Sequence, residues 1–167
     1  MSSAGFDPLA ALQALTSAEV DFVLIGGVAA RLHGSPTLTR DVDICHERDP
    51  ENLERLSSVL RSLHARLRGV DDDLPFLLDA RTLQAGGSFT FVTDVGDLDI
   101  LAVPAGTSGY DELEGAATAL DLGDFRVKVA SLDDLIRMKR AAARPKDLVE
   151  VEILAALRDE LDDLTAR

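Results

Sequence analysis

Two short segments decide the fold of this chain: FVLIGG at residues 22–27 and DVDI at residues 41–44. In an extended strand, residues i and i+2 project from the same face. The second segment therefore holds the carboxylates of Asp41 and Asp43 side by side, while its two apolar residues point into a core. Adjacent anions repel one another unless a cation lies between them, and hard oxygen ligands suit magnesium. The pattern predicts a magnesium site on a strand.

The first segment predicts how the chain reaches that site. Residues 22–25 are all apolar and indicate a short buried strand. Gly26 and Gly27 allow the backbone to turn sharply into a helix, which we expect over residues 28–33. The start of a helix presents free amide groups, and these can bind a phosphate. A strand, a Gly-Gly turn, a short helix and an Asp-x-Asp strand thus follow one another in an order that can hold metal and phosphate.

A third carboxylate is available on a later apolar segment, DLDILAV at residues 97–103. Asp97 and Asp99 would lie on one face of this strand. We prefer Asp99 as the third metal ligand because it lies deeper in the apolar run, with Asp97 as the alternative nearer the start of the strand.

These residues resemble the signature of the DNA polymerase β-like nucleotidyltransferase superfamily, with matches at Gly26, Gly27, Asp41, Asp43 and Asp99. The resemblance implies an α/β fold with a small mixed sheet flanked by helices and followed by C-terminal helices. It also implies magnesium-dependent transfer of a nucleoside monophosphate from a nucleoside triphosphate (NTP) to an acceptor hydroxyl, with release of pyrophosphate and two Mg²⁺ ions. In this family the three aspartates bind metal and act in catalysis.

The last third of the chain contains a second group of candidate residues. Ser131 is a good cap for a helix predicted over residues 132–143, after which Pro145 interrupts the helical pattern and a second helix begins. Lys139, Arg144, Lys146 and Asp147 resemble a Lys, then Arg-x-Lys-Asp, region of bacterial nucleotidyltransferase-like proteins related to abortive-infection and toxin–antitoxin systems. The resemblance implies that Lys139 is catalytic and contacts the triphosphate, and that Lys146 and Asp147 belong to the nucleotide site.

Other polar residues near the first two segments complete the expected nucleotide site. Arg40 can neutralise charge on the phosphates, and Ser35 and Thr39 offer hydroxyl contacts. Gly26 and Gly27 bring the backbone close to the phosphates.

We expect one nucleotidyltransferase-like domain over residues 1–167, with a core at about 20–130 and a helical segment at about 131–165. Its remaining elements are predicted from periodicity. They are helices at 8–15, about 50–67 and 110–120, a hairpin of 89–92 with 98–103, a strand at 125–129, and a final helix from 146 whose buried side carries Leu148, Val151, Leu154, Leu157, Leu161 and Leu164. Arg55, Arg61, Arg66 and Arg68 are interpreted as a solvated face of the helix after Pro50.

Composition narrows the class of protein. The chain has 167 residues, of which 46% are hydrophobic, enough for one globular domain. Its start has neither a basic region nor an apolar stretch, and no run is long enough to span a membrane, so we expect a cytoplasmic protein. The formal charge of −13 argues against a broadly basic nucleic-acid surface. A single cysteine excludes an internal disulfide.

The acceptor stays open at this stage: a tRNA end, a protein or a small molecule of the antibiotic type. The last-third block favours a toxin-like enzyme, whereas the acidic charge suits a small molecule. The competing hypothesis is a non-catalytic nucleotide-binding or interaction module that pairs with a cognate toxin or antitoxin protein.

Overall fold

The computed structural model describes residues 5–167, so the first four residues of the start discussed above lie outside it. The helices are α1 (Pro8–Ser17), α2 (Gly26–Leu32), α3 (Pro50–Ser62), α4 (Ala80–Ala85), α5 (Tyr110–Ala116), α6 (Leu132–Ala142) and α7 (Pro145–Thr165). The strands are β1 (Phe22–Ile25), β2 (Asp41–His46), β3 (Arg66–Leu67), β4 (Ser88–Thr93), β5 (Gly96–Leu101), β6 (Thr118–Asp121) and β7 (Arg126–Val129).

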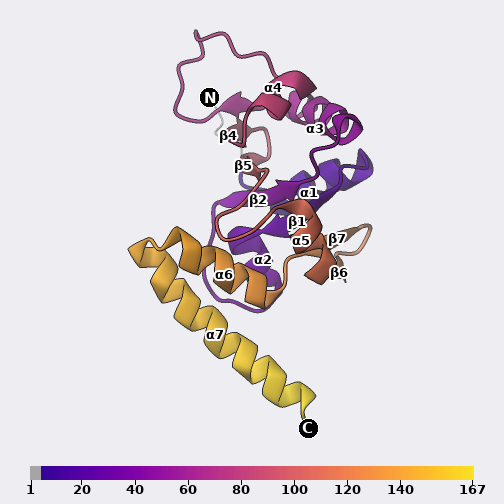
Figure 1. The fold of residues 1–167 in the computed structure, drawn as a ribbon. Coiled ribbons are helices and arrows are strands. Elements are labelled where there is room, and N and C mark those ends of the chain that lie inside the picture. The colour runs from indigo at the N-terminus through magenta and orange to yellow at the C-terminus, as the bar shows by residue number, and fades with distance from the viewer. Residues whose placement is uncertain (1–4) are drawn as a thin grey trace.

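The strands described form one mixed sheet in the order β3-β4-β5-β2-β1-β7-β6. β1 and β2 are antiparallel, β2 and β5 are parallel, and β4 and β5 form the expected hairpin. All four residues of β1 are buried, so both faces of the sheet are covered at this central strand. Figure 1 shows α1 and α3 beside the upper part of the sheet, and α2, α5 and α6 beside its lower part. The expected α/β class, a small mixed sheet flanked by helices, is confirmed.

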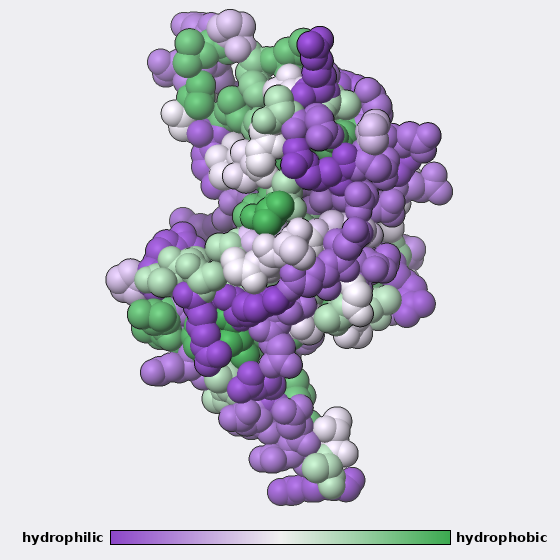
Figure 2. All heavy atoms as spheres, viewed as in Figure 1, coloured by the Kyte–Doolittle hydropathy of each residue, from purple (hydrophilic) through white to green (hydrophobic). Residues whose placement is uncertain are grey.

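The two C-terminal helices pack against each other, and α6 also packs against α2. The predicted cap at Ser131 is confirmed, because its Oγ accepts a hydrogen bond from the amide of Asp134 at 3.1 Å. α7 then extends away from the sheet to the C-terminus (Figure 1), and its far part is mainly hydrophilic in the view of Figure 2. No helix within residues 5–167 combines the length and apolarity needed to cross a bilayer.

The helix after Pro50 is shorter than predicted. α3 buries Leu53, Leu56 and Leu60 as the stripe requires, but it ends at Ser62. His64 then adopts a left-handed conformation with φ of 54°, which a continuing helix does not allow. Arg66 and Leu67 pair instead with β4, opposite Val92 and Phe91. Arg66 and Arg68 are therefore not on a helix face.

Three further expectations differ from the structure. The helix at 110–120 stops at Ala116, because residues 118–121 pair with β7 as strand β6. α4, which the periodicity did not predict, is a short helix capped by Asp79. The stripe on α7 is buried only at Val151 and Leu154 and partly at Leu157, since the helix leaves the body; the exposed members are Leu148, Leu161 and Leu164.

The buried His46 at the end of β2 makes folding pH-dependent. Its side chain is 2% exposed, and Nδ1 has no hydrogen-bond partner among the described residues. Burial, aided by the charge of Arg48, lowers the pKa of His46 from 6.5 to about 4. The unfolded chain therefore binds a proton at a higher pH than the folded one, so stability is present above pH 6.5 and falls as the pH drops toward 4.

We expect His46 to lower the free energy of unfolding by about 2 kcal/mol between pH 7 and pH 5. Urea denaturation of the protein and of the His46→Leu variant at both pH values measures this loss. The difference between the two proteins isolates His46 from the other titrating groups. An identical pH dependence in both proteins would contradict the assignment.

Candidate active site

The parallel pairing of β2 with β5 brings the candidate carboxylates together. The register places Asp41 opposite Asp97 and Asp43 opposite Asp99. Because all four side chains project from the same face of the sheet, the two Asp-x-Asp pairs meet. One carboxylate oxygen each from Asp41, Asp43 and Asp99 lies within 4.8 Å of the others. Asp97 lines the same cavity, but no oxygen of it belongs to this group of three.

The three carboxylates crowd one another in the protein alone. Burial, followed by the charges of Asp41 and Asp99, raises the pKa of Asp43 to about 8, against a smaller opposing effect of Lys139. Burial also raises the pKa of Asp99, although Arg68 opposes the change. At neutral pH the group therefore holds a proton in place of full negative charge. A divalent cation would replace that proton, and the donor set of three carboxylate oxygens suits Mg²⁺.

Gly26 and Gly27 are required by close approaches to this group. Gly26 has a φ of 70°, and a Cβ atom there would lie 2.2 Å from Oδ2 of Asp43. A Cβ atom on Gly27 would lie 2.6 Å from the Cβ of Thr39. Both distances are too short for atoms that are not bonded to each other. Only glycine lets α2 begin directly beside the carboxylates.

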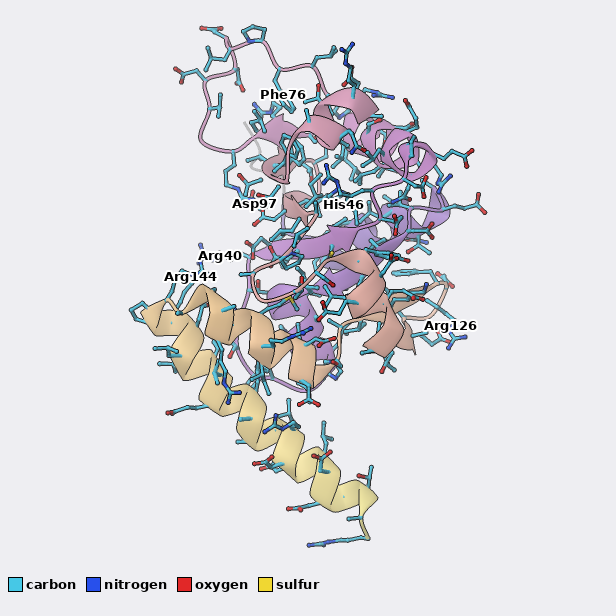
Figure 3. The ribbon with its side chains drawn as sticks, viewed as in Figure 1. Arg40, His46, Phe76, Asp97, Arg126 and Arg144 are labelled. Carbon is cyan, nitrogen blue, oxygen red and sulfur yellow. The ribbon has the colours of Figure 1, made fainter. Side chains whose placement is uncertain are left out.

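A cavity of 390 Å³ opens beside the carboxylates. Figure 3 shows three of the residues that line it, Asp97, Arg40 and Arg144, on the same side of the molecule. Nine of the eleven residues predicted for the site line this cavity. The two that do not line it are Gly26 and Asp147. The members that line it are Gly27, Ser35, Thr39, Arg40, Asp41, Asp43, Asp99, Lys139 and Lys146. The structure therefore brings together residues that are more than a hundred positions apart in the sequence.

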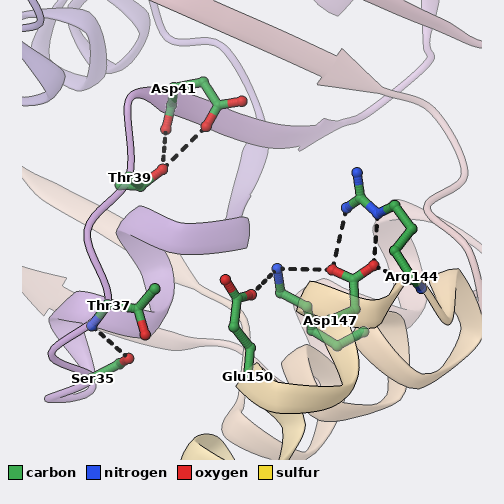
Figure 4. Close-up of polar contacts among 8 residues, drawn as sticks. Ser35, Thr37, Thr39, Asp41, Arg144, Asp147 and Glu150 are labelled. Carbon is green, nitrogen blue, oxygen red and sulfur yellow. Dashed lines mark hydrogen bonds and ion pairs between the residues drawn. The ribbon is translucent and has the colours of Figure 1, made fainter.

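The loop between α2 and β2 contributes hydroxyl groups to the cavity. Thr39 Oγ1 donates a hydrogen bond to Oδ1 of Asp41 at 3.1 Å (Figure 4). Ser35 is 6% exposed, and its Oγ accepts a hydrogen bond from the amide of Thr37 at 3.3 Å. Thr39 thus orients a carboxylate, whereas Ser35 shapes the loop.

Asp147 organises the basic residues on the other side of the cavity. It is fully buried, and its carboxylate accepts hydrogen bonds from Arg144 N at 3.2 Å and Arg144 Nε at 2.6 Å. Lys139 Nζ lies 3.4 Å from the same carboxylate (Figure 4). The hydrogen bond with Arg144 holds the pKa of Asp147 below its usual value, so it stays ionised. Asp147 therefore fixes the turn between α6 and α7 and holds Lys139 and Arg144 at the cavity.

Arg68 is a site residue that the sequence analysis missed. Its backbone amide donates to the carbonyl of Thr90, which lies opposite Asp99 in the sheet. The guanidinium consequently contacts Asp99 through Nη2 and lies 3.4 Å from Asp97 through Nε. The signal in the sequence was the polar-apolar-polar alternation of residues 66–68, which the continuing leucine pattern of the preceding helix obscured.

The chain resembles solved structures of nucleotidyltransferases in its fold. No family model and no curated protein matches the chain. Among solved structures, the lincomycin-bound lincosamide antibiotic adenylyltransferase LnuA matches with a TM-score of 0.60 at 13% identity, covering 89% of this chain and 94% of its own. ANT(2″)-Ia in complex with adenylyl-2″-tobramycin matches with a TM-score of 0.51 at 19% identity, covering 90% of this chain and 94% of its own.

A Thermotoga maritima protein assigned as a nucleotidyltransferase also matches, with a TM-score of 0.50 at 15% identity and coverage of 93% of this chain and 90% of its own. At these low identities the likeness establishes the fold. The chain has the fold of these nucleotidyltransferases, as the sequence led us to expect.

We expect Arg68 to offset the repulsion among the carboxylates until a cation does so. Without a divalent cation, Arg68→Ala should lower the free energy of unfolding by about 2 kcal/mol, because Asp99 loses its charged partner. The same variant should gain more stability from Mg²⁺ than the original protein does. Thermal unfolding with and without Mg²⁺ measures both effects.

Arg66→Ala is the matched control, since Arg66 pairs with exposed Asp72. Equal losses in the two variants, with equal responses to Mg²⁺, would show that Arg68 has no special relation to the carboxylates.

Proposed function

We propose that this protein is a magnesium-dependent nucleotidyltransferase that moves a nucleoside monophosphate from an NTP to an acceptor hydroxyl. The observation that carries the proposal is the meeting of Asp41, Asp43 and Asp99 beside a cavity with basic residues on its other side. Carboxylates there suit metal ions, and the basic residues suit a triphosphate. The fold shared with nucleotidyltransferases supports the same conclusion.

The three aspartates would hold two Mg²⁺ ions, with Asp41 and Asp43 on the triphosphate side and Asp99 nearer the acceptor. When bound, such ions stabilise negative charge on the attacking and leaving oxygens of an in-line displacement. Asp43, whose pKa burial raises, would give up its proton when the site is loaded. Arg68 would keep Asp99 in place without metal.

The basic residues would bind the triphosphate. Lys139 and Arg40 would neutralise charge on the phosphates, with Lys146 as a further contact, and Gly26 and Gly27 would let the phosphates approach the backbone. In the reaction, the acceptor oxygen forms a bond to the α-phosphorus while the bond from that phosphorus to the bridging oxygen of pyrophosphate breaks. The electron pair of the broken bond leaves with pyrophosphate. The acceptor hydroxyl gives its proton to Asp99 or to water.

We further propose a small molecule as the acceptor. Lincomycin is bound in LnuA and adenylyl-2″-tobramycin in ANT(2″)-Ia, and this chain covers 94% of both structures. The formal charge of −13 is unfavourable for a large polyanion such as tRNA. A tRNA end or a protein remains the alternative acceptor that the following experiment distinguishes.

The direct test follows label from each α-labelled NTP in the presence of Mg²⁺ and a whole-cell extract. We expect metal-dependent label on a small molecule. The Asp41→Asn/Asp43→Asn variant should lose more than about a hundredfold of this activity, because it keeps the side-chain shape but removes two metal ligands.

Asp71→Asn/Asp73→Asn is the matched control, since these exposed residues have the same Asp-x-Asp spacing and lie in the loop before α4. Label on RNA or on protein would show that the acceptor belongs to that class and is not a small molecule. Binding of NTP without any transfer, together with a stable complex with another protein, would support an interaction module of a toxin–antitoxin pair instead.

A further inference from the structure

Glu150 is an acidic side chain in a cavity whose other contacts suit phosphate. It lines the 390 Å³ cavity together with Arg40, Lys139, Arg144 and Lys146. A carboxylate beside a triphosphate is unfavourable unless it faces a different part of the ligand. Figure 4 shows Glu150 on α7, whereas Asp41 of the metal group lies at the start of β2.

Glu150 is one of two carboxylates that contact Lys139. Its Oε2 lies 2.5 Å from Lys139 Nζ, but the same nitrogen also lies 3.4 Å from fully buried Asp147. Asp147 lies in the first turn of α7 and is fully buried, whereas the side chain of Glu150 is 24% exposed and borders the cavity. Lys139 therefore keeps a contact with Asp147 when Glu150 turns to a ligand.

The place of Glu150 along the cavity indicates which part of a nucleotide it faces. The lining of the cavity also includes Ala30 and Leu154, which are apolar. Ala30 lies four residues after Gly26, about 6 Å farther along α2, and Leu154 lies one helical turn after Glu150 on α7. Glu150 thus contacts Lys139, a candidate phosphate ligand, and lies one helical turn before the apolar Leu154. In a nucleotide the ribose stands between the phosphates and the base.

We propose that Glu150 recognises the ribose by accepting hydrogen bonds from its 2′- and 3′-hydroxyl groups, so that the site selects ribonucleoside over 2′-deoxyribonucleoside triphosphates. Two carboxylate oxygens match two adjacent hydroxyl donors, and such charge-assisted bonds are stronger than neutral ones. Carboxylates perform this task in dinucleotide-binding folds as well. Lys139 turns from Glu150 to the phosphates when the nucleotide binds. The proposal rests on the proposed function, because it requires the triphosphate in this cavity.

The test compares binding of the four NTPs with binding of their 2′-deoxy forms, by calorimetric titration with Mg²⁺ and no acceptor. We expect the original protein to bind the best NTP about tenfold or more tightly than its 2′-deoxy form. Equal affinities would overturn the proposal. This comparison needs no variant and so does not depend on the folding of one.

The Glu150→Ala and Glu150→Gln variants separate ribose recognition from support of Lys139. Glu150→Ala should reduce the preference for the ribonucleotide to about onefold, and Glu150→Gln should leave a smaller preference than that of the original protein, since an amide keeps a neutral acceptor. A uniform loss of affinity for both sugars, with the preference unchanged, would show that Glu150 acts only on Lys139.

Glu152→Ala is the matched control, because Glu152 lies on the exposed side of the same helix, and its preference should equal that of the original protein. If the protein bound NTPs and 2′-deoxy-NTPs equally and its activity depended on Asp41 and Asp43, ribose recognition would be rejected and the proposed function would stand. Absence of binding by every NTP would reject the proposed function, and ribose recognition with it.

Discussion

The site depends on one constraint, the parallel register of β2 against β5. This register sets Asp43 opposite Asp99 and Asp41 opposite Asp97, so the four carboxylates share one face of the sheet. A slip of one residue would turn one pair of aspartates to the other face and bury carboxylates among the core residues. The apolar neighbours Val42, Ile44, Leu98 and Ile100 prevent that slip because they are fully buried in the present register.

The concentration of negative charge explains the other residues around the site. Arg68 pairs with two of the carboxylates from the β4 side, and Lys139 approaches from α6. Even so, burial, followed by the charges of Asp41 and Asp99, raises the pKa of Asp43 to about 8, and Lys139 lowers it only in part. The protein alone is therefore organised around a charge that it does not fully neutralise. A divalent cation would supply the missing positive charge at the carboxylates. This is the physical basis of the proposed metal dependence.

Sequence reasoning worked where a local pattern determines the structure. The apolar run before Gly26, the Asp-x-Asp alternation and the Ser131 cap each act within a few residues, and the fold follows them. It failed at Arg68 and at β6, where pairing with another strand overrides helical periodicity. The stripe on α7 was misjudged for a related reason, since its pattern is amphipathic but the helix extends past the surface that would cover it. The partners of Arg68 and Glu150 in their ion pairs depend on tertiary placement, which a local pattern does not specify.

The most direct test of the account is to locate metal in crystals grown with Mn²⁺ and a non-hydrolysable NTP, using the anomalous scattering of manganese. The account predicts two Mn²⁺ ions bound by Asp41, Asp43 and Asp99, both in contact with the triphosphate. Manganese absent from these carboxylates, or a triphosphate bound elsewhere in the protein, would contradict it.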